Sequence, residues 1–210
     1  DRADSAFAQL DPKSLDWENI LDGVDWLHWS GITPALSANC AEITIKALQH
    51  ANKKGIMVSG DLNYRSNLWQ YGKAPHQIMP SLMELTHVMI AGVRDFNQCL
   101  QQDFSKFKEV RKYAFEVFPK LKYLVKTERE SIGSSHNVMK AGLYSATESF
   151  ESRTYDLIPI VDRVGTGDAF GGGLIYGLLH LAPQEAIELA MAAGALKHSV
   201  PGDQLLCSLQ

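Results

Sequence analysis

The sequence predicts an α/β fold with a mainly parallel central sheet that is flanked by helices on both faces. Two observations predict it. Short apolar runs, typical of buried strands, alternate with segments whose apolar residues recur at three- and four-residue spacing, as on one helix face. Strands that alternate with helices favour parallel pairing under two layers of helices. In addition, no internal repeat or linker interrupts the 210 residues, so we expect a single domain over 1–210.

The first strand–helix–strand unit illustrates the pattern. We expect strands over 26–31 and 56–61, and between them apolar residues from Leu36 to Ala51 share one helical face. Gly55 follows this helix, as glycine often does at a helix end. The remaining expected elements are a short helix opened by Pro75, strands over 86–91 and 122–127, a helix around 106–118, short antiparallel edge strands between about 141 and 160, and helices over 168–180 and 183–198.

Composition excludes several classes of protein. The formal net charge of −4 argues against nucleic acid as the main partner, because that role normally requires a basic face. Cys40, Cys99 and Cys207 lie far apart without a zinc or redox spacing, which indicates free thiols in a reducing compartment. No run approaches the roughly 18 to 20 apolar residues of a membrane span. We therefore expect a cytoplasmic protein without a membrane partner, and the missing initiator Met indicates a piece of a longer polypeptide.

The segment Gly165-Thr166-Gly167-Asp168 carries the clearest chemical signal. Two glycines let backbone amides turn towards an anion, and a helix that begins there adds unpaired amides and positive potential. This arrangement suits a phosphoryl group. Asp168 would repel a resting phosphate, but it could accept the proton of an attacking hydroxyl. On spacing alone, Asp168 could equally be a helix N-cap.

The same segment, continued by Ala169 and Phe170, is similar to the signature of the ribokinase (PfkB) family of carbohydrate kinases. Further segments resemble the 2-keto-3-deoxygluconate kinases within that family: 29–33, 61–65 with 68–69, 162–164, 173–178, and 195–198 with 201–203. The resemblance covers nearly the whole chain and implies a ribokinase-like fold. It also implies that this chain is the C-terminal two-thirds of a longer kinase, whose first strands and β lid precede Asp1.

The resemblance implies an activity and a set of roles. The expected reaction is transfer of a phosphoryl group from ATP, with Mg²⁺, to the terminal hydroxyl of 2-keto-3-deoxygluconate. Asp168 would be the base, and Gly165, Thr166 and Gly167 would form the anion hole. A homo-oligomer through the absent lid region is expected. Two alternatives are a family kinase for another sugar, such as fructose, and a non-catalytic nucleotide- or sugar-acid-binding protein.

A sugar acid carries a carboxylate, which calls for arginine in its pocket because the planar guanidinium matches that group. Arg65 follows an expected strand at its carboxyl end, where ligands of such sheets bind. Arg2 lies in a segment that resembles the family's tyrosine-x-arginine substrate contact, although the tyrosine would precede Asp1. Asp203, after Pro201 and Gly202, resembles a ligand of a substrate hydroxyl. An ordinary turn aspartate is the other interpretation of Asp203.

The nucleotide site is expected from several segments. The resemblance places nucleotide contacts at Asn63, Arg65, Thr127, Arg129, Gly165 and Gly167, with Glu128 as a weaker candidate. Thr127 is expected at the end of its strand. Arg163 could neutralise charge on the transferred group or form a surface ion pair.

One segment departs from the family pattern. After the third strand the family usually has asparagine-x-x-glutamate, which organises magnesium near the phosphates, whereas this chain has Gly92-Val93-Arg94-Asp95. Asp95 alone retains a carboxylate and is the expected metal-site residue, since Mg²⁺ takes oxygen ligands and keeps several waters. A natural variant, weakened metal handling and a break in the chain would each explain the difference.

Overall fold

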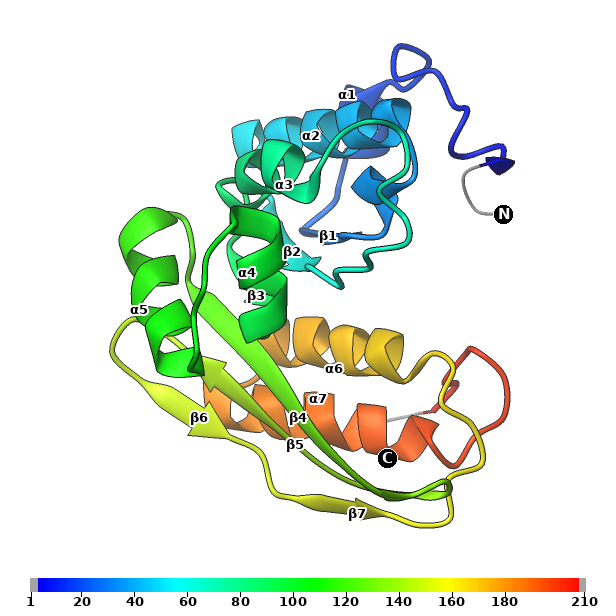
Figure 1. The fold of residues 1–210 in the computed structure, drawn as a ribbon, viewed down its shortest axis with the longest axis vertical. Helices are drawn as coiled ribbons and strands as arrows, with labels where there is room; N and C mark the ends of the chain where they lie inside the picture. The colour runs from blue at the N-terminus through cyan, green and yellow to red at the C-terminus, as the bar shows by residue number, and fades with distance from the viewer. Residues whose placement is uncertain (1–3, 208–210) are drawn as a thin grey trace. The chain divides into compact units, whose positions relative to one another are not determined.

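A computed structural model of the chain describes residues 4–207. The chain divides into two compact units, Asp1–Leu124 and Val125–Gln210. Strand β4 (Tyr123–Gly133) begins in the first unit and continues in the second, as the green ribbon of Figure 1 shows. That the two units act as a single domain stays a prediction.

The N-terminal unit is built on parallel strands. β1 (Trp26–Ser30), β2 (Met57–Asp61) and β3 (Val88–Ile90) follow in this order and lead to the start of β4. β1 pairs with β2 and β2 with β3, both in parallel. The predicted strands over 26–31, 56–61 and 86–91 are thereby confirmed, with ends that differ by one or two residues. Parallel order brings the carboxyl ends of these strands to one edge of the sheet.

Helices cover these strands. They are α1 (Trp17–Ile20), the 3₁₀ helix η2 (Thr33–Ala35), α2 (Ala38–Lys53), α3 (Pro75–Met83), α4 (Val93–Leu100) and α5 (Phe107–Val117). Ser37 caps α2, because its hydroxyl oxygen accepts from Cys40 N at 3.1 Å. The apolar faces meet in one core that includes Leu48, Val58 and Phe96, all fully buried. Burying each such side chain contributes about 1.5–3 kcal/mol. Within residues 4–207, no helix has the length and apolarity to cross a membrane.

The C-terminal unit combines antiparallel strands with two long helices. β5 (His136–Tyr144) lies next to β4 and pairs in antiparallel fashion with β6 (Ser149–Glu151) and β7 (Tyr155–Leu157). α6 (Thr166–His180) and α7 (Pro183–Lys197) lie side by side, and α7 packs on β5 (Figure 1). The predicted helices over 168–180 and 183–198 are confirmed, including a proline in the first turn of α7.

Glycines set how closely α6 approaches α7. A Cβ atom on Gly177 would lie 2.6 Å from the Cα of Ala186, and one on Gly173 would lie 3.0 Å from the Cβ of Ala193. Both distances are shorter than ordinary contact, so a larger residue would push the helices apart. From the other side, Gly194 of α7 faces the first turn of α6, where its Cβ would lie 3.4 Å from Thr166 O. The glycines therefore fix the position of the first turn of α6 relative to α7.

Two features differ from the expectations. The predicted strand over 122–127 extends to Gly133 and forms a hairpin with β5, so Thr127 lies inside β4 and not at its end. Beyond Thr127, β4 continues with the exposed polar residues Arg129, Glu130 and Ser131 and has no apolar run, so the strand forms through pairing with β5. α4 covers Val93–Leu100, a segment that was considered only for its metal motif.

Candidate active site

The predicted anion-binding loop forms the start of α6. Gly165 is the N-cap and has φ +75°, a left-handed backbone that glycine adopts without strain. The first hydrogen bond of the helix runs from Ala169 N to Gly165 O at 2.9 Å. The amides of Thr166, Gly167 and Asp168 precede this ladder and have no intrahelical acceptor. Three donors and the positive end of the helix dipole are thus available to an anion.

Asp168 does not cap the helix. The cap position belongs to Gly165, and Asp168 lies three residues later, within the first turn of α6. The Asp168 side chain is exposed, and its carboxylate forms no hydrogen bond or salt bridge with the described residues. The capping interpretation is therefore excluded. A carboxylate without a partner beside an anion loop can accept a proton from a ligand.

One cavity brings three of the predicted residues together. Gly165, Asp168 and Asp203 all line a cavity of about 750 Å³. The backbone carbonyl of Asp203 packs against Gly165, where a Cβ atom would lie only 2.0 Å from the carbonyl oxygen. The remaining walls come from the two helices and the segment after Asp203, and they include Tyr176, Leu189, Ala192, Ala193, Leu196 and Leu205. The cavity is large enough for a drug-sized ligand.

Thr166 and Gly167 do not line this cavity. The Thr166 hydroxyl donates to Arg163 O at 3.1 Å and braces the turn into the helix. The Arg163 guanidinium donates to Ser134 O at 2.7 Å, and Arg163 forms no salt bridge among the described residues. The hydrogen bond to Ser134 O holds the Arg163 side chain, and the surface ion pair that was one interpretation of Arg163 does not form among the described residues. The Arg163 guanidinium is held by a backbone carbonyl and not by a carboxylate.

Positive charge gathers near the anion-binding loop. Burial lowers the pKa of His198, and the charges of Arg163, Arg129 and Lys197 lower it further, although a hydrogen bond to Gly194 O at 2.8 Å opposes the shift. These three cations are close enough to affect one imidazole. Of the three, Arg163 lies two residues before Gly165, where its charge favours an anion at the loop.

The predicted nucleotide contacts on β4 lie on one face of the strand. Thr127 and Arg129 are two residues apart and exposed, so they project to the same side. Glu128 points to the opposite side and pairs with Lys126 at 2.6 Å and Lys140 at 3.3 Å. Hydrogen bonds from these lysines lower the pKa of Glu128 despite its partial burial. Glu128 is therefore occupied by ion pairs, while Thr127 and Arg129 remain available.

In the N-terminal unit, Asn63 and Arg65 follow β2. Asn63 adopts φ +37°, which is uncommon outside glycine, and its backbone N donates to Asp61 Oδ1 at 3.1 Å. Arg65 Nε donates to Asn63 Oδ1 at 3.3 Å, and the Arg65 side chain is exposed. The local backbone thus presents a guanidinium whose terminal nitrogens face solvent. Arg2 lies outside the described residues.

Asp95 organises the backbone around the carboxyl ends of β2 and β3. Its Oδ2 accepts from Gly92 N at 2.7 Å and its Oδ1 accepts from Tyr64 N at 3.2 Å. Each carboxylate oxygen keeps a free lone pair, which suits one direct or water-mediated contact to Mg²⁺. Residues 4–207 contain no group of three or more metal-ligating side chains. The predicted metal site would therefore depend on Asp95, waters and the phosphates of the nucleotide.

Comparison with known proteins decides the family. Residues 2–209 match the pfkB family carbohydrate kinases. The chain belongs to this family. It is 33% identical over 204 residues to a 2-dehydro-3-deoxygalactonokinase of Haloferax volcanii, which covers 97% of this chain and 60% of that protein. It is 29% identical to a 2-dehydro-3-deoxygluconokinase of Bacillus subtilis, over 84% of this chain and 51% of that protein.

Solved structures of PfkB kinases agree with the fold. The crystal structure of a 2-dehydro-3-deoxygluconokinase from Thermotoga maritima superposes with a TM-score of 0.85 at 39% identity, over 96% of this chain and 62% of the other. The ribokinase-like fold expected from the sequence is thereby confirmed. The chain spans about 60% of the length of the Haloferax relative and 51% of the Bacillus one.

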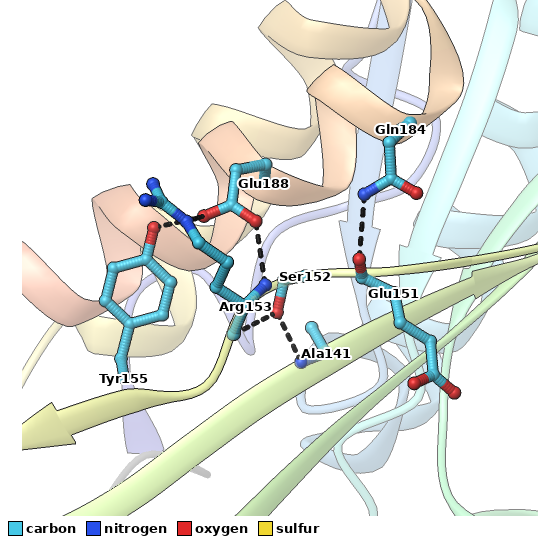
Figure 2. A network of polar contacts seen from close by, with 7 residues as sticks. All are labelled: Ala141, Glu151, Ser152, Arg153, Tyr155, Gln184 and Glu188. Atoms are coloured by element: carbon cyan, nitrogen blue, oxygen red, sulfur yellow. Dashed lines mark hydrogen bonds and ion pairs between the residues drawn. The ribbon is translucent and has the colours of Figure 1, made fainter.

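Two polar groupings of this PfkB chain were missed by sequence reasoning. Asp162, three residues before the anion-binding loop, accepts from Val164 N and Gly202 N. Glu188 of α7 accepts from the Arg153 amide and guanidinium and from the Tyr155 hydroxyl, as Figure 2 shows. Burial opposes the charge of Glu188, but these hydrogen bonds outweigh it and lower its pKa. Aspartate and glutamate at these places carry no distinctive sequence signal, because the partners that define the two groupings lie 33 to 40 residues away, whereas the Asp162 bond to Val164 is local.

The Glu188 network anchors the strands to α7. Figure 2 shows Gln184 on the same helix, whose amide donates to Glu151 O at 2.7 Å at the end of β6. The Ser152 hydroxyl donates to Arg153 O at 2.8 Å and accepts from Ala141 N at 3.0 Å. The segment between β6 and β7 is thus held on both sides. Its role in this unit is to fix α7, which supplies one wall of the cavity.

Proposed function

We propose that the protein to which this chain belongs transfers the γ-phosphoryl group of ATP to the terminal hydroxyl of a 2-keto-3-deoxy sugar acid, with 2-keto-3-deoxygluconate as the first candidate. One observation carries this proposal. The unpartnered carboxylate of Asp168 and the free amides at the start of α6 belong to one turn, which opens into a cavity that Asp203 also lines. A base and an anion site are the two parts that phosphoryl transfer to an alcohol needs.

Each residue of this turn would have a separate role in the transfer. Asp168 accepts the proton of the attacking hydroxyl, which raises the nucleophilicity of its oxygen. The amides of Thr166, Gly167 and Asp168 donate to the oxygens of the phosphoryl group while its charge is redistributed. Gly165 gives these amides their direction because it alone can hold φ +75° against the Asp203 carbonyl. Positioning and charge stabilisation supply most of the rate.

The proposed acceptor follows from charge. Arg65 would bind the carboxylate of the sugar acid, since its terminal nitrogens are exposed and only Nε has a partner among the described residues. Asp203 would accept from a hydroxyl of the acceptor. Arg2 would assist at the carboxylate. The names of the Haloferax and Bacillus relatives, both kinases of 2-dehydro-3-deoxy sugar acids, support this class of substrate.

The donor would be ATP with Mg²⁺. Thr127 and Arg129 on β4, together with Asn63 and Arg65, are the proposed contacts to the nucleotide. Asp95 would hold the metal through one free lone pair and bound waters, consistent with the few protein ligands that Mg²⁺ usually takes. When bound, the metal neutralises phosphate charge. The positive charges of Arg163, whose guanidinium donates to Ser134 O, and of Arg129 would favour the anionic donor.

The test is a substrate panel with the full-length protein. ATP consumption is measured with Mg²⁺ against 2-keto-3-deoxygluconate, 2-keto-3-deoxygalactonate, gluconate, fructose and ribose. The two keto-deoxy acids differ in configuration at one carbon, so they distinguish the substrate named for the Haloferax relative from that named for the Bacillus relative. Gluconate keeps the carboxylate and lacks the keto-deoxy unit. Turnover confined to the keto-deoxy acids supports the proposal. Faster turnover with fructose or ribose contradicts the sugar-acid assignment, and ATP binding without turnover favours a binding protein.

A further inference from the structure

The carboxylate of Asp162 joins two segments that are far apart in the sequence. Its Oδ1 accepts from Arg163 N at 2.7 Å and from Val164 N at 3.0 Å, just before the anion-binding loop. Its Oδ2 accepts from Gly202 N at 2.8 Å, in the turn that precedes Asp203. All three distances are those of good hydrogen bonds to a carboxylate. One side chain therefore contacts both of the segments that contribute Gly165 and Asp203 to the cavity lining.

Other bonds make the same connection. Val161 N and Asp162 N both donate to His198 O, at 2.8 and 3.2 Å. Lys197 stabilises the turn after α7: its side chain is fully buried and donates to Val200 O at 2.8 Å. These bonds hold the start of the turn at His198 and Val200. The hydrogen bond from Gly202 to Asp162 holds it further along, next to Asp203.

We propose that Asp162 is a positioning residue that sets the distance between the anion-binding loop and Asp203. The inference rests on the proposed function, in which the loop holds the phosphoryl group and Asp203 holds the acceptor. Transfer requires that these two ligands lie at a defined separation, and small errors in separation slow such reactions strongly. Asp162 achieves this without touching either ligand, because each of its oxygens holds the backbone of one segment.

The charge of Asp162 strengthens this link. Hydrogen bonds from the amides of Val164 and Gly202 hold the pKa of the Asp162 carboxyl below its usual range, against a smaller effect of burial. The side chain is therefore ionised at neutral pH and all three bonds are charge-assisted. Lys197 adds a favourable charge from the buried side.

The alternative is a purely local role, because aspartate often accepts from amides one or two residues later and forms a turn. That role needs only the bonds to Arg163 and Val164. The bond to Gly202, 40 residues away, belongs to the positioning role alone. Asp162→Asn separates the two, because an amide keeps one oxygen for Val164 but presents an NH₂ group to the Gly202 amide. Asp162→Ala removes both sets of bonds.

The experiment combines amide hydrogen exchange with steady-state kinetics on the full-length protein and its Asp162→Asn variant. We expect the amide of Gly202 to exchange about tenfold faster, because it loses one hydrogen bond to a charged group. The amide of Val164 should remain protected. The kcat should fall because the two ligands are misplaced, and the KM for the acceptor should rise by about tenfold while the KM for ATP changes less. Asp156→Asn is the matched control, an aspartate of the same unit whose partner is His136, and it should alter none of these values.

The outcomes separate the two proposals. Unchanged exchange at Gly202, or equal rises in both KM values, overturns the positioning role. If the wild-type protein phosphorylates no acceptor, the proposed function fails, and the exchange at Gly202 alone decides whether Asp162 holds the two segments together. If Asp162→Ala does not fold, Asp162→Asn still decides the result.

Discussion

The carbonyl oxygen of Asp203 lies 2.0 Å from the point that a Cβ atom on Gly165 would occupy. Two predicted site residues, 38 positions apart, are thus in backbone contact, and only a residue without a side chain allows it. This contact joins the anion-binding loop to the proposed acceptor ligand. It also makes Gly165 sensitive to the smallest substitution.

Gly165→Ala should destabilise the protein and abolish most phosphoryl transfer. A left-handed backbone costs an alanine about 1–2 kcal/mol, and the clash with Asp203 O adds to this cost by moving the backbone. The matched control is Gly55→Ala, which has the same φ of +75° but no atom within 4 Å of its Cβ position. Urea denaturation should show a clearly larger loss for Gly165→Ala. Equal losses would mean that the contact with Asp203 carries no cost.

Asp168→Asn should keep ATP binding and lower kcat by about 100- to 10,000-fold, the usual contribution of a general base. The change is nearly isosteric, and Asp168 has no partner among the described residues whose loss could disturb the fold. Rates with the best acceptor and nucleotide affinity by titration calorimetry give the two values. Near-normal turnover would refute the base assignment.

The sequence was most informative where structure is local. The strands over 26–30 and 57–61 and the helix between them follow from apolar spacing, because burial on one face leaves a periodic pattern. The anion-binding loop was also predictable, since its glycines and Asp168 are consecutive. A helix start needs no distant partner to be recognised.

Long-range relationships were not predictable from these patterns. The extension of β4 to Gly133 depends on its pairing with β5, and its polar, exposed residues resemble a loop. Asp95 was assigned to a metal, yet its oxygens also hold the amides of Gly92 and Tyr64. The Asp162 bond to Gly202 joins segments whose proximity follows only from the packing of α7.

The glycines of α6 allow a paired test of helix packing. Gly177→Ala places a methyl group 2.6 Å from the Cα of Ala186 and should cost about 1–3 kcal/mol by overpacking, less about 1 kcal/mol gained in helix propensity. Gly172→Ala in the same helix meets no atom within 4 Å and should stabilise by about 0.5–1 kcal/mol. Thermal unfolding should therefore shift in opposite directions. A stabilising Gly177→Ala would show that the close approach of the helices is not required.

Arg65→Ala should lower kcat/KM for a keto-deoxy sugar acid by about ten- to a hundredfold, the effect of losing charge-assisted hydrogen bonds to a carboxylate. Any activity with a neutral sugar should fall less, because it loses only the proposed nucleotide contact of Arg65. Arg111→Ala, an arginine on α5, serves as a control for the loss of one positive charge. The ratio of the two specificity constants is the informative quantity. An equal loss with acid and neutral sugars would leave Arg65 the nucleotide contact alone and refute its contact with the carboxylate.

His87 should make the stability of the protein depend on pH. Its Nδ1 accepts from Val58 N at 3.0 Å, so protonation at Nδ1 breaks a hydrogen bond to β2. Burial, with Lys122 and Lys120, lowers the pKa of His87 in the folded protein. The unfolded chain, with a pKa of about 6.5, therefore takes up a proton first as the pH falls. The contribution of neutral His87 is complete above about pH 6.5 and is lost as the pH drops below it.

His87→Asn keeps an acceptor near the position of Nδ1 and removes the titrating group. The decrease in urea midpoint from about pH 7.5 to about pH 5.5 should be smaller for this variant than for the wild type. It should not vanish, because burial also lowers the pKa of His198 and adds a change of the same sign. His76→Asn removes a histidine of α3 outside this hydrogen bond and serves as the control. An unchanged decrease in His87→Asn would show that Nδ1 of His87 is not the group whose protonation weakens β2.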